Sequence, residues 1–60
     1  MNFKAWINQL KTIMVIKGLI NKNTVLCRDS WKVYYDDGLD CWQTLDEEFG
    51  KDWRKLKTNN

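Results

Sequence analysis

The stretch NFKAWINQLKTIMVIKG, residues 2–18, decides the fold. At about 100° per residue, its large apolar side chains fall on one stripe of a helix, whereas Lys4, Asn8 and Lys11 fall outside it. Asn2 is a suitable N-cap, and Gly18 can end a helix in the left-handed conformation. The pattern predicts an amphipathic helix over about residues 2–17. Its predicted buried face consists of Phe3, Trp6, Ile7, Leu10, Ile13 and Met14.

A second helical pattern begins at Asp40. Asp40 and Gln43 have the spacing of a capping box, and the apolar residues that follow recur every three or four positions as far as Leu56. Gly50 interrupts this pattern at a cost of about 1 kcal/mol relative to Ala, so we expect the helix to weaken or bend there. The sequence predicts a helix over about residues 41–56, with residues 57–60 frayed.

The segment between the two patterns allows two interpretations. Residues 24–35 are rich in β-branched and aromatic side chains, which is typical of a hairpin. Alternatively, Asp29 or Ser30 caps a short helix over about residues 30–37, which Gly38 ends. We favour the helix, because residues 37–40 (DGLD) have the pattern of an elbow between two helices.

The expected architecture follows from these three segments. We predict a mainly α fold, a single domain of three helices over residues 1–60; the alternative is an α+β fold with a hairpin at residues 24–35. The expected core consists of Trp6, Leu10, Trp31, Leu45, Phe49 and Trp53.

Length and composition argue against an enzyme. A chain of 60 residues is too short for a doubly wound sheet or a barrel, and it buries only about 60% of its unfolded surface. It contains no His, the commonest general base and metal ligand. Cys27 and Cys41 alone do not make a tetrahedral zinc site. We therefore expect a non-enzymatic protein, with no catalytic residue, cofactor or metal.

The apolar segments are short and interrupted by charge. The longest uninterrupted apolar run is Ile13–Ile16, far below the length that crosses a bilayer. The first twenty residues contain Lys11 and Lys17 and lack the pattern of a secretory signal. We expect a cytoplasmic protein with free thiols and no membrane partner; the sequence leaves its oligomeric state open.

The formal charge of +2 conceals three blocks. Residues 1–28 carry five basic and no acidic side chains, residues 29–49 carry seven acidic and one basic, and residues 50–60 carry four basic and one acidic. The macrodipole of the helix predicted from residue 41 accounts for acids at its start and bases at its end. It does not account for Asp36 and Asp37, which lie beside Tyr34 and Tyr35.

An acidic elbow flanked by aromatic residues suits a basic partner, because charge steers the encounter and buried aromatic side chains hold the complex. We therefore expect this region to bind a larger protein with a basic surface, such as a nucleic-acid-binding host protein. The predicted contact residues are Tyr34, Tyr35, Asp36, Asp37, Asp40, Trp42, Asp46 and Glu47.

The alternative function is a small DNA-binding regulator of helix-turn-helix type. A short helix, a turn with Gly and a longer helix is the outline of that motif. The acidic side chains at residues 46–48 oppose phosphate binding, the dominant attractive force toward DNA. The residues that would bind nucleic acid are Lys4, Lys11, Lys51, Arg54 and Lys55.

The style of the chain supports the first interpretation. A small Pro-free chain with Asn- and Lys-rich loops and the segment SWKVYYDDGL, residues 30–39, resembles small orphan proteins of bacteriophages and other mobile elements. The resemblance implies a protein that binds and inhibits a host protein, and it assigns a role to no individual residue.

Overall fold

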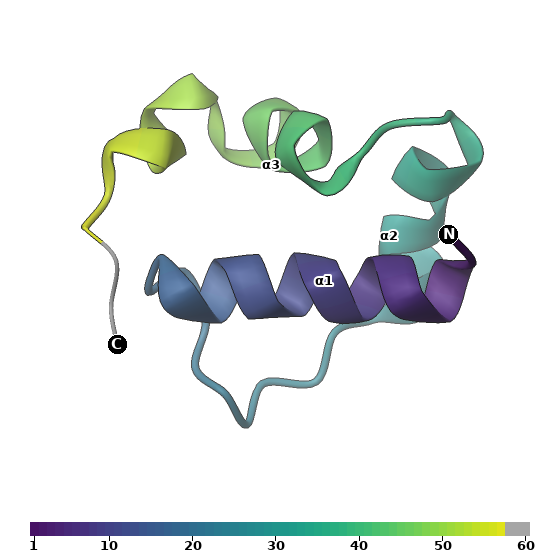
Figure 1. Ribbon diagram of the computed structural model, residues 1–60, viewed down its shortest axis with the longest axis horizontal. Helices are drawn as coiled ribbons and strands as arrows, with labels where there is room; N and C mark the ends of the chain where they lie inside the picture. The colour runs from purple at the N-terminus through teal and green to yellow at the C-terminus, as the bar shows by residue number, and fades with distance from the viewer. Residues whose placement is uncertain (58–60) are drawn as a thin grey trace.

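The computed structural model describes residues 1–57 as three α-helices and a 3₁₀-helix (Figure 1). They are α1 (Phe3–Ile16), α2 (Arg28–Asp36), α3 (Cys41–Phe49) and η1 (Lys51–Lys55). No strand occurs in these residues, so the mainly α prediction is confirmed and the hairpin at residues 24–35 is wrong. The fraying predicted for the chain end falls largely on residues 58–60, outside the described residues.

The helices are arranged around α1. In Figure 1, α3 and η1 lie along one side of α1, while the connection at residues 17–27 passes along the opposite side. α2 lies near the N-terminal end of α1. α1 is therefore the central element of the fold.

Local backbone hydrogen bonds fix both ends of α1. The Asn2 Oδ1 accepts a hydrogen bond from the Ala5 N–H at 2.8 Å, as its N-cap position predicts. At the other end Gly18 has φ 74°, and the Leu19 N–H donates to the Met14 carbonyl at 2.8 Å. This is a Schellman ending, in which glycine adopts the left-handed conformation without a Cβ penalty.

α2 begins earlier than predicted but ends as predicted. Its N-cap is Cys27, so the expectation that Asp29 or Ser30 caps it is wrong. Cys27 is extended and its carbonyl already accepts from the Trp31 N–H at 3.3 Å, which places residues 29 and 30 inside the first turn. Gly38, with φ 82°, ends α2 at the predicted elbow.

α3 begins with the predicted capping box. The Gln43 N–H donates to the Asp40 side chain at 2.7 Å, and the Asp40 N–H donates to the Gln43 side chain at 3.0 Å. The helix was predicted to run to about residue 56 with a weak point or bend at Gly50; the break does fall at Gly50, but it ends α3 at Phe49. Gly50 adopts φ 78° and ψ 157°, which is not helical, and the chain continues as η1.

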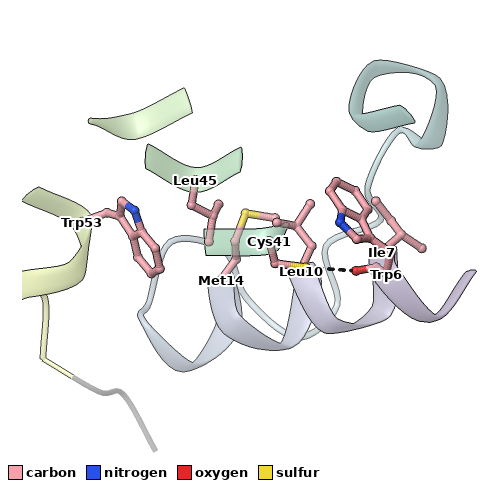
Figure 2. Close-up of a cluster of buried hydrophobic side chains, with 7 residues drawn as sticks. All are labelled: Trp6, Ile7, Leu10, Met14, Cys41, Leu45 and Trp53. Atoms are coloured by element: carbon pink, nitrogen blue, oxygen red, sulfur yellow. Dashed lines mark hydrogen bonds between the residues drawn. The ribbon is translucent and has the colours of Figure 1, made fainter. Parts of the chain in front are cut away.

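The core lies between α1 and the pair formed by α3 and η1 (Figure 2). Its buried side chains are Trp6, Ile7, Leu10, Met14, Cys41, Leu45 and Trp53. Four of the six predicted core residues are among them.

Two predicted core residues lie elsewhere. Trp31 is only partly buried and packs against the core from α2. Phe49 is 45% exposed, so its assignment to the core is wrong. The turn at Gly50 redirects the chain after Phe49, and Trp53 completes that end of the core near Leu45 (Figure 2).

Candidate protein-interaction surface

The elbow between α2 and α3 presents exposed carboxylates around Gly38. Asp36, Asp37 and Asp40 are all exposed. Asp36 lies 3.4 Å from the Lys32 ammonium, but both side chains are more than half exposed, and such pairs contribute about 0–1 kcal/mol. Asp40 uses one side-chain oxygen for its cap. The elbow therefore keeps most of its negative charge accessible to a partner.

The two predicted tyrosines serve mainly to hold α2 in place. The Tyr35 ring lies edge-on to Phe3 at 5.3 Å and to Trp6 at 5.6 Å, and its hydroxyl donates to the Met1 carbonyl at 3.0 Å. The Tyr34 hydroxyl donates to the Glu48 carboxylate at 2.6 Å. Both tyrosines are half-buried, so they are not free anchors for a partner.

The Tyr34–Glu48 bond also has an electrostatic consequence. The hydrogen bond to Glu48 raises the pKa of Tyr34 above its ordinary value, and partial burial and the nearby negative charge act in the same direction. The protonated hydroxyl is the form that joins α2 to α3.

Trp42 lies on a different flank of α3 from these tyrosines. Glu48, the partner of Tyr34, and Trp42 are about 120° apart around an ideal helix. The Trp42 ring packs 5.2 Å from that of Trp53, and the Arg54 guanidinium lies 5.3 Å from its centroid. The structure thus places Trp42 with Arg54 rather than with the tyrosines, and leaves it 43% exposed.

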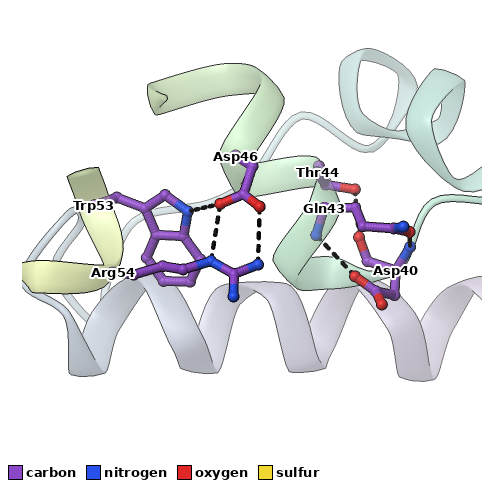
Figure 3. A network of polar contacts seen from close by, with 6 residues as sticks. All are labelled: Asp40, Gln43, Thr44, Asp46, Trp53 and Arg54. Atoms are coloured by element: carbon purple, nitrogen blue, oxygen red, sulfur yellow. Dashed lines mark hydrogen bonds and ion pairs between the residues drawn. The ribbon is translucent and has the colours of Figure 1, made fainter. Parts of the chain in front are cut away.

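Asp46 and Arg54, which the sequence assigned to opposite candidate sites, bind each other (Figure 3). The Arg54 Nε and Nη2 donate to the two Asp46 carboxylate oxygens at 3.0 and 2.8 Å. The Trp53 Nε1–H also donates to Asp46 at 2.8 Å. These hydrogen bonds, first of all those from Arg54, hold the pKa of Asp46 below its ordinary value. Both charges are therefore engaged within the fold.

Phe49 is a surface residue that the sequence analysis placed in the core. Trp42 and Phe49 are seven positions apart and so occupy the same flank of α3. Both are exposed, at 43% and 45%. The glycine that follows Phe49 is the sequence signal that could have indicated the change, since it allows the chain to turn before the next apolar residue.

Glu47 completes the acidic surface on the outer face of α3. It is exposed and forms no ion pair within residues 1–57. We use the name acidic surface for Asp36, Asp37, Asp40 and Glu47. Trp42 and Phe49, named the aromatic border, lie on the other flank of α3, about 140° and 160° around an ideal helix from Glu47.

The structure does not gather the predicted nucleic-acid-binding residues on one face. Lys11 lines a hollow between α1 and the 17–27 connection, whereas Lys51, Arg54 and Lys55 belong to η1, on the other side of α1 (Figure 1). Arg54 is bound to Asp46, and the Lys55 ammonium lies 3.7 Å from Asp52. The basic blocks of the sequence therefore do not form one continuous DNA-binding surface.

The two cysteines are free and lie in different environments. Cys41 is buried, and burial raises the pKa of its thiol to about 11. Cys27 is exposed, and a hydrogen bond with Ser30 lowers its pKa. Over residues 1–57, no group of three or more His, Cys, Asp or Glu side chains is placed to hold a metal ion. None of the helices in this part of the chain has the length and apolar character needed to cross a bilayer.

Comparison with known proteins finds no matching protein family, no matching curated protein and no matching solved structure. These comparisons therefore contribute nothing to a functional proposal for this chain.

Proposed function

We propose that the protein is a non-enzymatic binding module, which acts in the cytoplasm by docking on a larger protein with a basic surface and inhibiting or modulating it. A nucleic-acid-binding host protein is the kind of partner that this proposal favours, because such proteins carry extended basic surfaces. The resemblance of the chain to small proteins of bacteriophages supports inhibition as the mode of action.

The observation that carries the proposal is the exposure of the acidic surface. Asp46 and Glu48 have partners within the fold, whereas Asp37 and Glu47 are exposed and form no ion pair in the described chain. Unpaired carboxylates on one surface steer a basic partner toward it. They are poorly explained as a contribution to stability.

The aromatic border, on the flank of α3 opposite Glu47, supplies the second part of the argument. Trp42 is half-exposed and is held by packing against Trp53 and by the Arg54 guanidinium. A large aromatic side chain that is already held in one position loses little conformational freedom on binding. Trp42 is therefore the expected anchor, since Trp is enriched among the residues that dominate binding energy.

The proposal is tested by reversing charge on the acidic surface. We expect the variant carrying Asp37→Lys and Glu47→Lys to lose partners that the wild-type protein captures from a host-cell lysate, with captured proteins quantified by mass spectrometry. Once a partner is purified, Trp42→Ala should weaken its binding by about tenfold or more. The circular dichroism spectrum of each variant verifies its fold.

A matched control distinguishes the effect of mutating the acidic surface from the effect of changing the net charge of the protein. Asp29→Lys with Asp52→Lys makes the same change in formal charge at exposed positions outside the acidic surface. We expect this control to keep the partners. If the folded Asp37/Glu47 variant keeps every partner, or if the control loses as many, the acidic surface is not the binding site.

A further inference from the structure

The side of α1 opposite α3 carries a groove that the proposed function does not use. The 17–27 connection and the start of α2 run along this side and leave two hollows against α1. The first is lined by Lys11, Arg28 and the aliphatic Ile7, Val25 and Leu26. The second is lined by Lys11, Lys22 and the aliphatic Val15 and Ile16. Because Lys11 borders both hollows, they are adjacent; together they are named the basic groove.

The cations of the basic groove have no internal counter-charge. Lys11, Lys22 and Arg28 form no ion pair with any residue of the described chain. Residues 1–28 contain no Asp or Glu, and the first acidic residue, Asp29, follows Arg28 in the sequence and lines neither hollow. Lys4 lies seven positions before Lys11 and therefore extends the same positive face along α1. The groove is therefore electropositive over its length.

The lining of the groove is aliphatic as well as basic. Val25 is 89% exposed, the most exposed of the large apolar side chains. Val15 and Ile16 lie at the end of α1, outside its buried stripe, and remain half-buried. Exposed aliphatic side chains beside unpaired cations favour an occupant that is both apolar and negatively charged.

These features distinguish between possible anionic occupants. Single-stranded nucleic acid binds by stacking its bases on aromatic side chains, and neither hollow has an aromatic residue in its lining. A duplex backbone would use the cations but leave the aliphatic side chains in water. A peptide that carries carboxylates and aliphatic side chains uses both kinds of lining residue.

We propose that the basic groove binds an acidic segment of a partner protein, with its carboxylates against Lys11, Lys22 and Arg28 and its aliphatic side chains in the two hollows. The groove is lined from the 17–27 connection, whereas the acidic surface belongs to the α2–α3 elbow and to α3; the connection and α3 lie on opposite sides of α1 (Figure 1). The two surfaces can therefore be occupied together, and the failure of one leaves the other untouched.

The probe is a fluorescein-labelled peptide of about fourteen residues with Leu at every third or fourth position and Glu between them, a spacing that gives a helix one apolar face. We expect it to bind the full chain in a fluorescence anisotropy titration at low salt, and to bind more weakly as salt is added. The same peptide with Lys in place of Glu should not bind. With Ser in place of Leu it should bind about tenfold more weakly.

Variants of the protein locate the binding. Lys11→Glu with Lys22→Glu should weaken binding of the acidic peptide by about tenfold or more. The matched control, Lys51→Glu with Lys55→Glu, makes the same change in charge on η1 and should bind as the wild type does. Val25→Ser should also weaken binding without loss of fold, because the Val25 side chain is exposed.

Defined outcomes would overturn the assignment. It is wrong if the acidic peptide does not bind, if the η1 control loses as much affinity as the groove variant, or if duplex DNA of about twenty base pairs binds more tightly than the peptide and with a steeper salt dependence. The Asp37→Lys/Glu47→Lys variant should bind the peptide normally, which keeps this test independent of the proposed function.

Discussion

Asp46 and Arg54 form two parallel hydrogen bonds, of 2.8 and 3.0 Å, across the turn at Gly50 where α3 gives way to η1. The same carboxylate accepts from the Trp53 indole, whose ring is buried in the core. A single acidic side chain thus fixes the direction of η1 relative to α3. The charges of Asp46 and Arg54 are thus engaged within the fold.

The Asp46–Arg54 pair predicts a dependence of stability on pH. The pKa of Asp46 is lowered on folding from its ordinary value of 3.8, mainly by the hydrogen bonds from Arg54. The ionised Asp46 side chain therefore stabilises the folded state fully above this ordinary pKa. The stabilisation is lost as the pH falls through the lower pKa that Asp46 has in the folded protein. We expect Asp46→Asn to lower the melting temperature at pH 7, and the difference from wild type to shrink in acid.

Thermal unfolding followed by circular dichroism between pH 7 and pH 2 measures this effect. Asp52→Asn is the control, since the Asp52 side chain is 93% exposed and lies 3.7 Å from Lys55. A difference between Asp46→Asn and wild type that stays constant into acid would contradict the assigned role.

Two residues of α3, one buried and one exposed, should differ in how much the fold is destabilised when each is replaced by Ala. Leu45 is fully buried, so Leu45→Ala should reduce the free energy of unfolding by about 2–5 kcal/mol. Phe49 is 45% exposed, so Phe49→Ala should cost less than about 1 kcal/mol. Urea unfolding of the two variants gives both values. Similar losses in both would show that Phe49 belongs to the core after all.

The elbow predicts a backbone penalty at Gly38. Its φ of 82° lies in the left-handed region, and an added Cβ would meet no atom within 4 Å. Gly38→Ala should therefore destabilise the fold by about 1–2 kcal/mol through the backbone alone. Gly38→Asn should cost less, because Asn tolerates this conformation. Chemical unfolding of both variants tests the order, and an Ala variant as stable as the wild type would contradict it.

The two thiols predict selective modification. The hydrogen bond from Ser30 lowers the pKa of exposed Cys27 below 9.0, so its thiolate forms at a lower pH than in an ordinary cysteine. Burial raises the pKa of Cys41 to about 11. A disulfide reagent should modify Cys27 in the folded protein and reach Cys41 only after unfolding.

Mass spectrometry of the labelled protein identifies the modified residue, and Cys27→Ser is the control that should leave the native chain unlabelled. Rapid labelling of Cys41 in the folded Cys27→Ser variant would show that this part of the core opens readily.

Helix ends were predictable where the signals are local. The Asn2 cap, the Asp40–Gln43 box and the stops at Gly18 and Gly38 depend on hydrogen bonds between residues at most five positions apart. The end of α3 at Gly50 was not predictable in this way. An apolar pattern that continues past Gly50 fits one long helix as well as two short ones, and the choice depends on the burial of Trp53 against α1.

The sequence predicted the negative charge of the candidate surface but not the contacts that its side chains make within the fold. A run of acids around Gly38 is exposed because carboxylates are costly to bury. The hydrogen bond from the Tyr35 hydroxyl to the Met1 carbonyl joins residues 34 positions apart, and it depends on tertiary packing that no local sequence pattern encodes. The basic groove was missed for the same reason, because its second wall is a connection with no periodic pattern.

The central position of α1 also governs how the chain reaches its fold. The Trp6 indole donates to the Leu39 carbonyl and the Cys41 thiol donates to the Trp6 carbonyl, which joins residues 33 and 35 positions apart. α2, which lies between them in the sequence, contains no buried residue of its own. The core residues of α1 and those of α3 and η1 can therefore pack only after the chain between α1 and α3 has brought them together. The entropy cost of closing this loop must be met before packing stabilises the fold. The three helices should consequently form and melt in one cooperative transition.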